Sequence, residues 1–147
     1  MFKTLSLSVS VAAAALTLAA GSTFAAPADD ARTHFQAIAS GDLAVVMRGY
    51  ADNARFEWIG GPLDGSYATP DAIRGVWTKF TGSQGPLKLS VDKLEESANP
   101  KGATVSANVQ FEGKAPIKVR YVLTFRDGKI VAETWQIDPK LAVAAAY

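Results

Sequence analysis

Two side chains, His34 and Glu133, could carry proton-transfer chemistry. An imidazole changes its charge near neutral pH, so it can take up and return a proton. A carboxylate can act as a general base, particularly where burial disfavours its charged form. The chain has one histidine and no cysteine, which excludes thiolate chemistry and a multi-histidine metal site. We therefore expect no metal and no cofactor.

His34 lies on the apolar stripe of a predicted helix. Ala31, His34, Phe35 and Ile38 follow the spacing i, i+3, i+4, i+7, which is one face of a helix. Two interpretations stay open. His34 is either a partly buried structural histidine, satisfied by a carbonyl or carboxylate, or a pocket-lining acid, base or hydrogen-bond donor.

Glu133 lies on the last predicted strand, residues 130–137. Strand alternation puts it on the same face as Trp135. An acid on that face would lose hydration, which suits a general base. The alternative is a strand-edge glutamate paired with Arg120 or Lys118. A one-residue slip in register would produce that arrangement, because it moves every side chain to the opposite face.

Aromatic residues are the strongest indication of a ligand site. Large aromatic side chains with a polar edge suit a pocket for a flat or ring-shaped molecule. The alternative is an ordinary core, which we prefer for Trp77. A glycine-rich loop could carry a tyrosine to the mouth of the pocket as part of a lid. The predicted ligand-binding residues are Phe56, Trp58, Tyr121, Trp135 and, in that loop, Tyr67.

Helical patterns dominate the first half of the chain after residue 25. The first helix ends at Gly41, which tolerates a left-handed cap. Asp42 can cap the second helix, whose apolar stripe runs to Tyr50. Thr69 followed by Pro70 is a typical start for the third helix.

Strand patterns dominate the second half. Alternating polar and apolar residues predict strands near 87–91, 104–111, 117–125 and 130–137, after an earlier strand at 55–58. Asp127–Gly128 is typical of a hairpin turn. The order helix, helix, strand, helix, then a strand meander predicts an α+β domain with helices on one face of the sheet.

The N-terminus has the order of a secretory signal peptide. A basic start at Lys3 is followed by an uncharged apolar run and then by small residues up to Ala25. We expect residues 1–25 to be the signal peptide and residues 26–147 to be the exported domain, periplasmic or secreted. The alternative is a membrane anchor, but the run is short for a span and rich in alanine.

Charge balance bears on the partners. Removing residues 1–25 takes away Lys3 alone, which leaves equal numbers of basic and acidic residues. No basic patch stands out, so we expect no nucleic-acid partner and no membrane partner after signal removal. We expect a small-molecule ligand. A homodimer could form through the polar sheet face that carries Thr104, Ser106, Asn108 and Gln110.

The motifs at the turns and element ends of the chain resemble those of the NTF2-like superfamily. Within this superfamily they are nearest to the SnoaL-like and ketosteroid-isomerase-like group. The resemblance rests on Tyr50-Ala51-Asp52-Asn53-Ala54, on the helix start at 69–73, and on the segment 123–130 closing at Asp138. It implies a cone, in which a curved antiparallel sheet wraps around three N-terminal helices and encloses a pocket. A homodimer is common in this superfamily. Because this fold hosts several activities, it decides no reaction by itself.

The resemblance also implies positions for a site. It places His34 where ketosteroid isomerases carry a hydrogen-bonding tyrosine, and Tyr121 where they carry a second donor. The isomerase base falls at Trp58, which cannot take a proton from carbon. The predicted catalytic residues are therefore His34 and Glu133. The leading hypothesis is an exported domain that binds a small apolar or aromatic molecule, with an isomerase-, cyclase- or hydratase-type proton transfer as a further step. The alternative is a non-catalytic binding or dimeric interaction module.

Overall fold

The computed structural model describes residues 26–144, and the predicted signal peptide lies outside this range. Three helices are found where the sequence predicts them: α1 (Pro27–Ser40), α2 (Leu43–Arg48) and α3 (Pro70–Gln84). Within residues 26–144, no helix is both long enough and apolar enough to cross a membrane.

Local signals in the sequence explain the helix ends. Gly41 adopts a left-handed conformation (φ 75°) and closes α1. The Asp42 carboxylate accepts a hydrogen bond from the Val45 amide at 3.2 Å at the start of α2. The Thr69 hydroxyl accepts one from the Ala72 amide at 3.1 Å at the start of α3.

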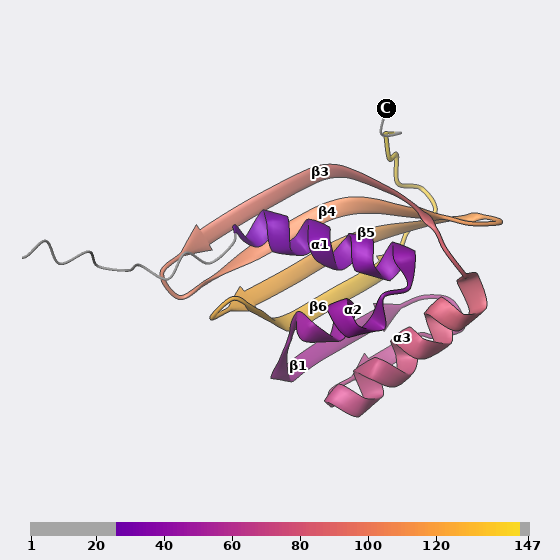
Figure 1. Ribbon diagram of the computed structural model, residues 1–147. Helices are drawn as coiled ribbons and strands as arrows, with labels where there is room; N and C mark the ends of the chain where they lie inside the picture. The colour runs from indigo at the N-terminus through magenta and orange to yellow at the C-terminus, as the bar shows by residue number, and fades with distance from the viewer. Residues whose placement is uncertain (1–25, 145–147) are drawn as a thin grey trace, which may run out of the picture.

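Six strands form one curved sheet that does not close into a barrel (Figure 1). Their order across the sheet is β2-β1-β6-β5-β4-β3. All neighbours are antiparallel except β1 and β6, which run parallel. The strands are β1 (Tyr50–Ile59), β2 (Gly65–Tyr67), β3 (Lys88–Asn99), β4 (Gly102–Glu112), β5 (Pro116–Arg126) and β6 (Lys129–Ile137).

The start of β1 differs from the sequence-based expectation. The predicted apolar stripe of the second helix included Tyr50, but α2 ends at Arg48 and Tyr50 begins β1. The Ile130 amide donates a 2.8 Å hydrogen bond to the Gly49 carbonyl, and Tyr50 pairs with Ile130 in the parallel ladder. The chain thus pairs with β6 directly after the helix ends. This pairing with a distant strand outweighs the local helical preference at Tyr50.

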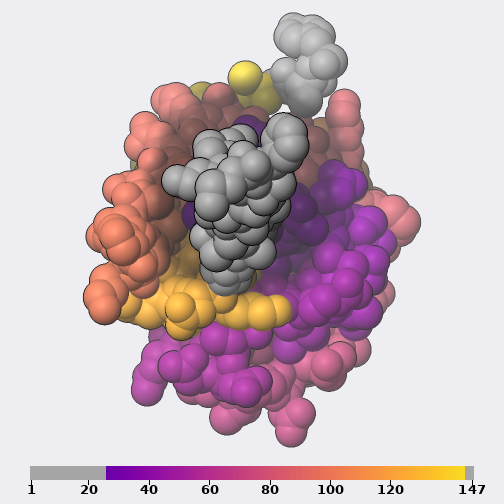
Figure 2. All heavy atoms as spheres, turned by 60° about the vertical axis from the view of Figure 1, so that its left-hand side comes forward, coloured from indigo at the N-terminus to yellow at the C-terminus, as the bar shows by residue number. Residues whose placement is uncertain are grey.

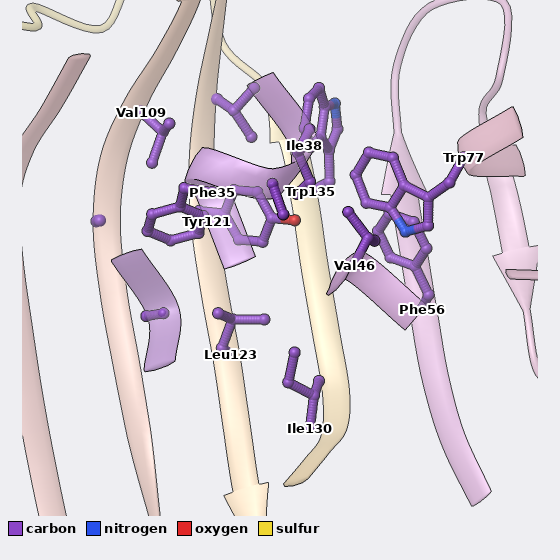
Figure 3. Packing of buried hydrophobic residues seen from close by; sticks show 14 of the residues in the cluster. Phe35, Ile38, Val46, Phe56, Trp77, Val109, Tyr121, Leu123, Ile130 and Trp135 are labelled. Atoms are coloured by element: carbon purple, nitrogen blue, oxygen red, sulfur yellow. The ribbon is translucent and has the colours of Figure 1, made fainter. Parts of the chain in front are cut away.

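The helices lie on the concave face of the sheet, and the core is the layer between them (Figure 1). In Figure 3, Phe35 and Ile38 of α1 lie against Tyr121 and Trp135 of the sheet. Figure 2 shows β3 and β4, in pink to orange, along one side and the purple segment of α2 and β1 along the other. The expected α+β architecture with helices on one sheet face is confirmed.

Candidate functional site

Five polar or aromatic side chains form a hydrogen-bonded group inside the core, here called the buried polar cluster: His34, Tyr50, Trp77, Tyr121 and Glu133. The Glu133 carboxylate is its centre. His34 Nε2 lies 2.7 Å from Glu133 Oε2, and the Tyr121 hydroxyl donates to the same oxygen at 2.6 Å. The Tyr50 hydroxyl donates to Glu133 Oε1, and Trp77 Nε1 donates to the Tyr50 oxygen at 2.7 Å.

Each member of the cluster comes from a different element. His34 lies on α1, Tyr50 on β1, Trp77 on α3, Tyr121 on β5 and Glu133 on β6. The β6 register places Glu133 opposite Phe56 on one side and Leu123 on the other, both of which are buried. The inward orientation expected from strand alternation is therefore observed. The alternative pairing of Glu133 with Arg120 or Lys118 is not.

The cluster isolates a carboxylate from bulk water. His34 is 3% exposed and Glu133 is 1% exposed. A carboxylate can only accept hydrogen bonds, so the geometry assigns a proton to His34 Nε2. In the described residues His34 is the only basic side chain in ion-pair range of Glu133.

The two tyrosines of the cluster are held in their neutral form. Burial raises the pKa of Tyr50 and that of Tyr121 well above 10, and the negative charge of Glu133 raises both further. A neutral phenol can donate its proton in a hydrogen bond, whereas a phenolate cannot. The phenols therefore stay available as hydrogen-bond donors to Glu133.

His34 also borders a small cavity of about 220 Å³ between α1, α2 and the start of β6. Thr33, Arg48 and Lys129 contribute to the same walls. His34 Nδ1 is buried and has no hydrogen-bond partner among residues 26–144. A Cβ atom at Gly49 would lie 3.5 Å from Nδ1, so a side chain there would contact the imidazole.

A larger cavity of about 760 Å³, here called the apolar pocket, lies between the C-terminal end of α3, the β1–β2 loop and the ends of β5 and β6. The loop contributes Leu63, and Trp58 and Phe80 form the deeper wall. Its apolar walls include Trp58, Leu63, Phe80, Ile117, Ile137 and Pro139.

The predicted site residues divide between these two places. His34, Tyr121 and Glu133 belong to the buried polar cluster, whereas Trp58 lines the apolar pocket. Trp135 stacks on Trp58 at 4.4 Å between ring centroids and is fully buried behind it. The structure does not bring Trp58 and His34 to the wall of one cavity.

The remaining two predicted residues support the pocket rather than line it. Phe56 is fully buried and stacks on Trp77 at 5.2 Å. The Tyr67 hydroxyl donates to the Leu63 carbonyl at 2.6 Å, which ties the β1–β2 loop down. The roles of all these residues in binding or catalysis stay predictions.

Sequence reasoning missed two members of the cluster. The helical spacing places Tyr50 on a helix, and the helix stripe favours plain core for Trp77. Gly49, immediately before Tyr50, could have marked the end of the helix. An indole N–H usually needs a partner when it is buried, which could have pointed to a polar group near Trp77.

The curved open sheet with helices on its concave face defines an NTF2-like fold. The sequence matches the model of the SnoaL-like domain family over residues 31–133, and the chain belongs to that family. Comparison with curated proteins gave no match.

Solved structures show the same fold at low identity. An NTF2-like protein of unknown function from Pseudomonas putida is 17% identical, with a TM-score of 0.65 over 76% of this chain and 85% of that one. A Thiobacillus denitrificans protein, provisionally described as a calcium/calmodulin-dependent protein kinase type II association domain, is 18% identical, with a TM-score of 0.66 over 78% of this chain and 97% of that one. A protein from Sinorhizobium meliloti, provisionally described as a polyketide cyclase, is 21% identical, with a TM-score of 0.52 over 74% of this chain and 94% of that one.

Proposed function

We propose that this domain binds a small apolar or aromatic molecule in the apolar pocket. The observation that carries the proposal is the pocket itself, about 760 Å³ with mainly apolar walls. Small-molecule sites are cavities of this kind, roughly 300–1,000 Å³ in volume. The Trp58 ring offers a flat surface on which a ring-shaped ligand can stack.

Binding fits the geometry better than catalysis by the His34–Glu133 pair. The two side chains are in direct contact at 2.7 Å, so no substrate atom fits between them. Both oxygens of Glu133 already accept hydrogen bonds from within the cluster. Neither His34 nor Glu133 is among the residues that form the wall of the apolar pocket.

The test is a calorimetric titration with a neutral probe, octan-1-ol, on the wild type and on two matched variants. Leu63→Gln places an amide at the pocket wall, where a half-buried leucine contributes apolar area. Fully burying a leucine side chain is worth about 1.5–3 kcal/mol, and a half-buried one contributes about half of that, so we expect roughly 3- to 12-fold weaker binding. Leu89→Gln makes the same change at a half-buried leucine of another cavity and should leave affinity unchanged. Equal losses in both variants would refute the pocket as the site.

A second candidate is proton transfer of the isomerase, cyclase or hydratase type at His34. The unpartnered Nδ1 beside the small cavity favours it, because a reacting group could bond there while Glu133 orients the ring. The test measures turnover, once a substrate is found, in Glu133→Gln. Loss of turnover with intact affinity supports the enzyme, and unchanged turnover rejects it.

The location of the protein is a further part of the proposal. The N-terminal pattern supports export and a periplasmic or secreted location, with residues 1–25 removed.

The last part of the proposal is a homodimer. The polar outer face of β4, which includes Ser106, Asn108 and Gln110, supports it. Light scattering on the purified domain and on Asn108→Arg tests the dimer, which the added charge should dissociate.

A further inference from the structure

The apolar pocket has a charged rim. Lys79 from α3 and Lys118 from β5 both border it, and no aspartate or glutamate does so among the described residues. Lys79 is exposed, and Lys118 is half-buried on the outer side of its strand, next to Ile117 of the pocket wall. Neither lysine forms an ion pair within the described part of the chain. Two lysines that form no ion pair within the described part of the chain therefore border an apolar cavity.

The dipole of α3 opposes the positive field of the two lysines but is weaker than it. The pocket lies at the C-terminal end of the helix, which carries roughly half a negative charge. That end is also partly satisfied, because the Gly85 amide donates to the Thr81 carbonyl at 3.1 Å. Two full positive charges exceed this partial charge, and low-dielectric walls concentrate their field in the cavity.

We propose that the ligand is an amphipathic anion, such as an aliphatic or aromatic carboxylic acid. Its apolar body lies against Trp58 and Phe80, and its carboxylate lies at the rim with Lys79 and Lys118. This inference rests on the proposed function, because it names the ligand class of the same pocket. The Ser83 hydroxyl already donates to the Phe80 carbonyl at 3.0 Å, and Gln84 offers a neutral amide, which leaves the lysines as the charged partners for the head group.

The experiment compares three probes with one apolar body and different heads: octanoate, octan-1-ol and octylammonium. Each is titrated into the domain by calorimetry at low salt. We expect octanoate to bind about 3- to 10-fold more tightly than octan-1-ol, and octylammonium to bind more weakly than either. Salt at about 0.5 M should remove most of the difference, because the rim is open to screening by ions.

Single-lysine variants locate the charge effect. Lys79→Gln and Lys118→Gln should each weaken octanoate binding about 2- to 4-fold and leave octan-1-ol binding unchanged. Lys101→Gln is the matched control. Lys101 directly precedes the first residue of β4, whereas Lys118 pairs with Gln110 near the other end of that strand, about 30 Å away along it. It should change the binding of no probe.

The outcomes separate the two proposals. If octan-1-ol and octanoate bind equally in the wild type, the pocket stands as a binding site and the anion inference is overturned. If none of the three probes binds, the proposed function itself fails. If Lys101→Gln weakens octanoate as much as the rim variants do, the effect belongs to the net charge of the protein, which also overturns the inference.

Discussion

At the scale of single residues, Glu133 has an unusual environment. It is 1% exposed and surrounded by aromatic rings, and its hydrogen bonds come from an imidazole and two phenols. Lysine and arginine, the usual partners of a buried carboxylate, do not pair with it within residues 26–144. The stability of the fold should therefore depend strongly on this one side chain.

Glu133→Gln tests that dependence. Glutamine keeps the shape but replaces one acceptor oxygen with an NH2 group, which cannot accept the hydrogen bond that the carboxylate accepts. A buried donor of the cluster is then left without a partner, and we expect the free energy of unfolding to fall by about 1–3 kcal/mol. Urea denaturation at pH 7 measures it.

The matched control is Glu95→Gln, which changes an exposed glutamate of β3. It should alter the free energy of unfolding by less than about 0.5 kcal/mol. A Glu133 variant as stable as this control would contradict a cluster held together by hydrogen bonds to Glu133.

The tyrosines predict a loss of stability in alkali. Their pKa values are raised by folding, so each contributes stability that is complete below about pH 10 and is lost as the pH rises toward the folded pKa. Above pH 10 the unfolded chain releases these protons while the folded chain keeps them. The free energy of unfolding should then fall by about 1.4 kcal/mol per pH unit for each tyrosine.

Tyr121→Phe isolates one of these contributions. The variant should be less stable at pH 7, because a donor to Glu133 is lost. Its stability should fall less steeply above pH 10 than that of the wild type, by about 1.4 kcal/mol per pH unit. Urea unfolding between pH 8 and pH 11 measures both slopes, and parallel curves would reject the raised pKa of Tyr121.

The sequence reveals the orientation of single residues where periodicity is strong. The i, i+3, i+4 spacing around His34 and the alternation around Glu133 place both side chains inward, and the structure agrees. Their mutual contact spans 99 positions of the chain, so no local pattern contains it. Tyr50 shows the limit, because its helical spacing was overridden by pairing with a strand about 80 residues later.

At the scale of elements, one glycine determines how β4 begins. Gly102 has a φ of 156°, and a Cβ atom there would lie 2.3 Å from the backbone carbonyl oxygen of Phe125 on β5. Both the conformation and the close approach of two strands exclude a side chain. This position therefore fixes the start of the β4–β5 ladder.

Gly102→Ala should destabilise the domain by at least about 2 kcal/mol, because the backbone of β5 must move to admit the methyl group. Gly75→Ala is the contrasting variant, since that glycine lies within α3 and no atom of the described residues outside the helix backbone and the two chain neighbours lies within 4 Å of the added atom. It should stabilise the domain by about 0.5–1 kcal/mol. Thermal unfolding of both variants tests the pair, and a neutral Gly102→Ala would contradict the close approach.

Element types could be predicted well, and element partners less so. Caps at Asp42 and Thr69 and the turn at Asp127–Gly128 mark ends that the structure confirms. The parallel pairing of β1 with β6 could not be derived, because it depends on where a long meander returns. The resemblance to known folds implied an antiparallel sheet, and this one parallel pair departs from it.

At the scale of the whole molecule, export is the main open prediction. If residues 1–25 are a signal peptide, the protein recovered from the exported fraction should begin at Ala26. Intact mass spectrometry measures this directly. A mass that retains residues 1–25 would favour an anchor, and Ala25→Leu should block cleavage if the small residue is required.

The stacking of Trp58 on Trp135 has an optical consequence. The chain has three tryptophans, and the third, Trp77, lies 5.5 Å from Trp58 and 5.6 Å from Trp135 between ring centroids. At such separations excitation passes among the indoles, so the emission of the three rings is coupled. A molecule that enters the cavity beside Trp58 should therefore change the intrinsic fluorescence and the near-ultraviolet circular dichroism of the entire protein. The domain carries its own label-free reporter of occupancy.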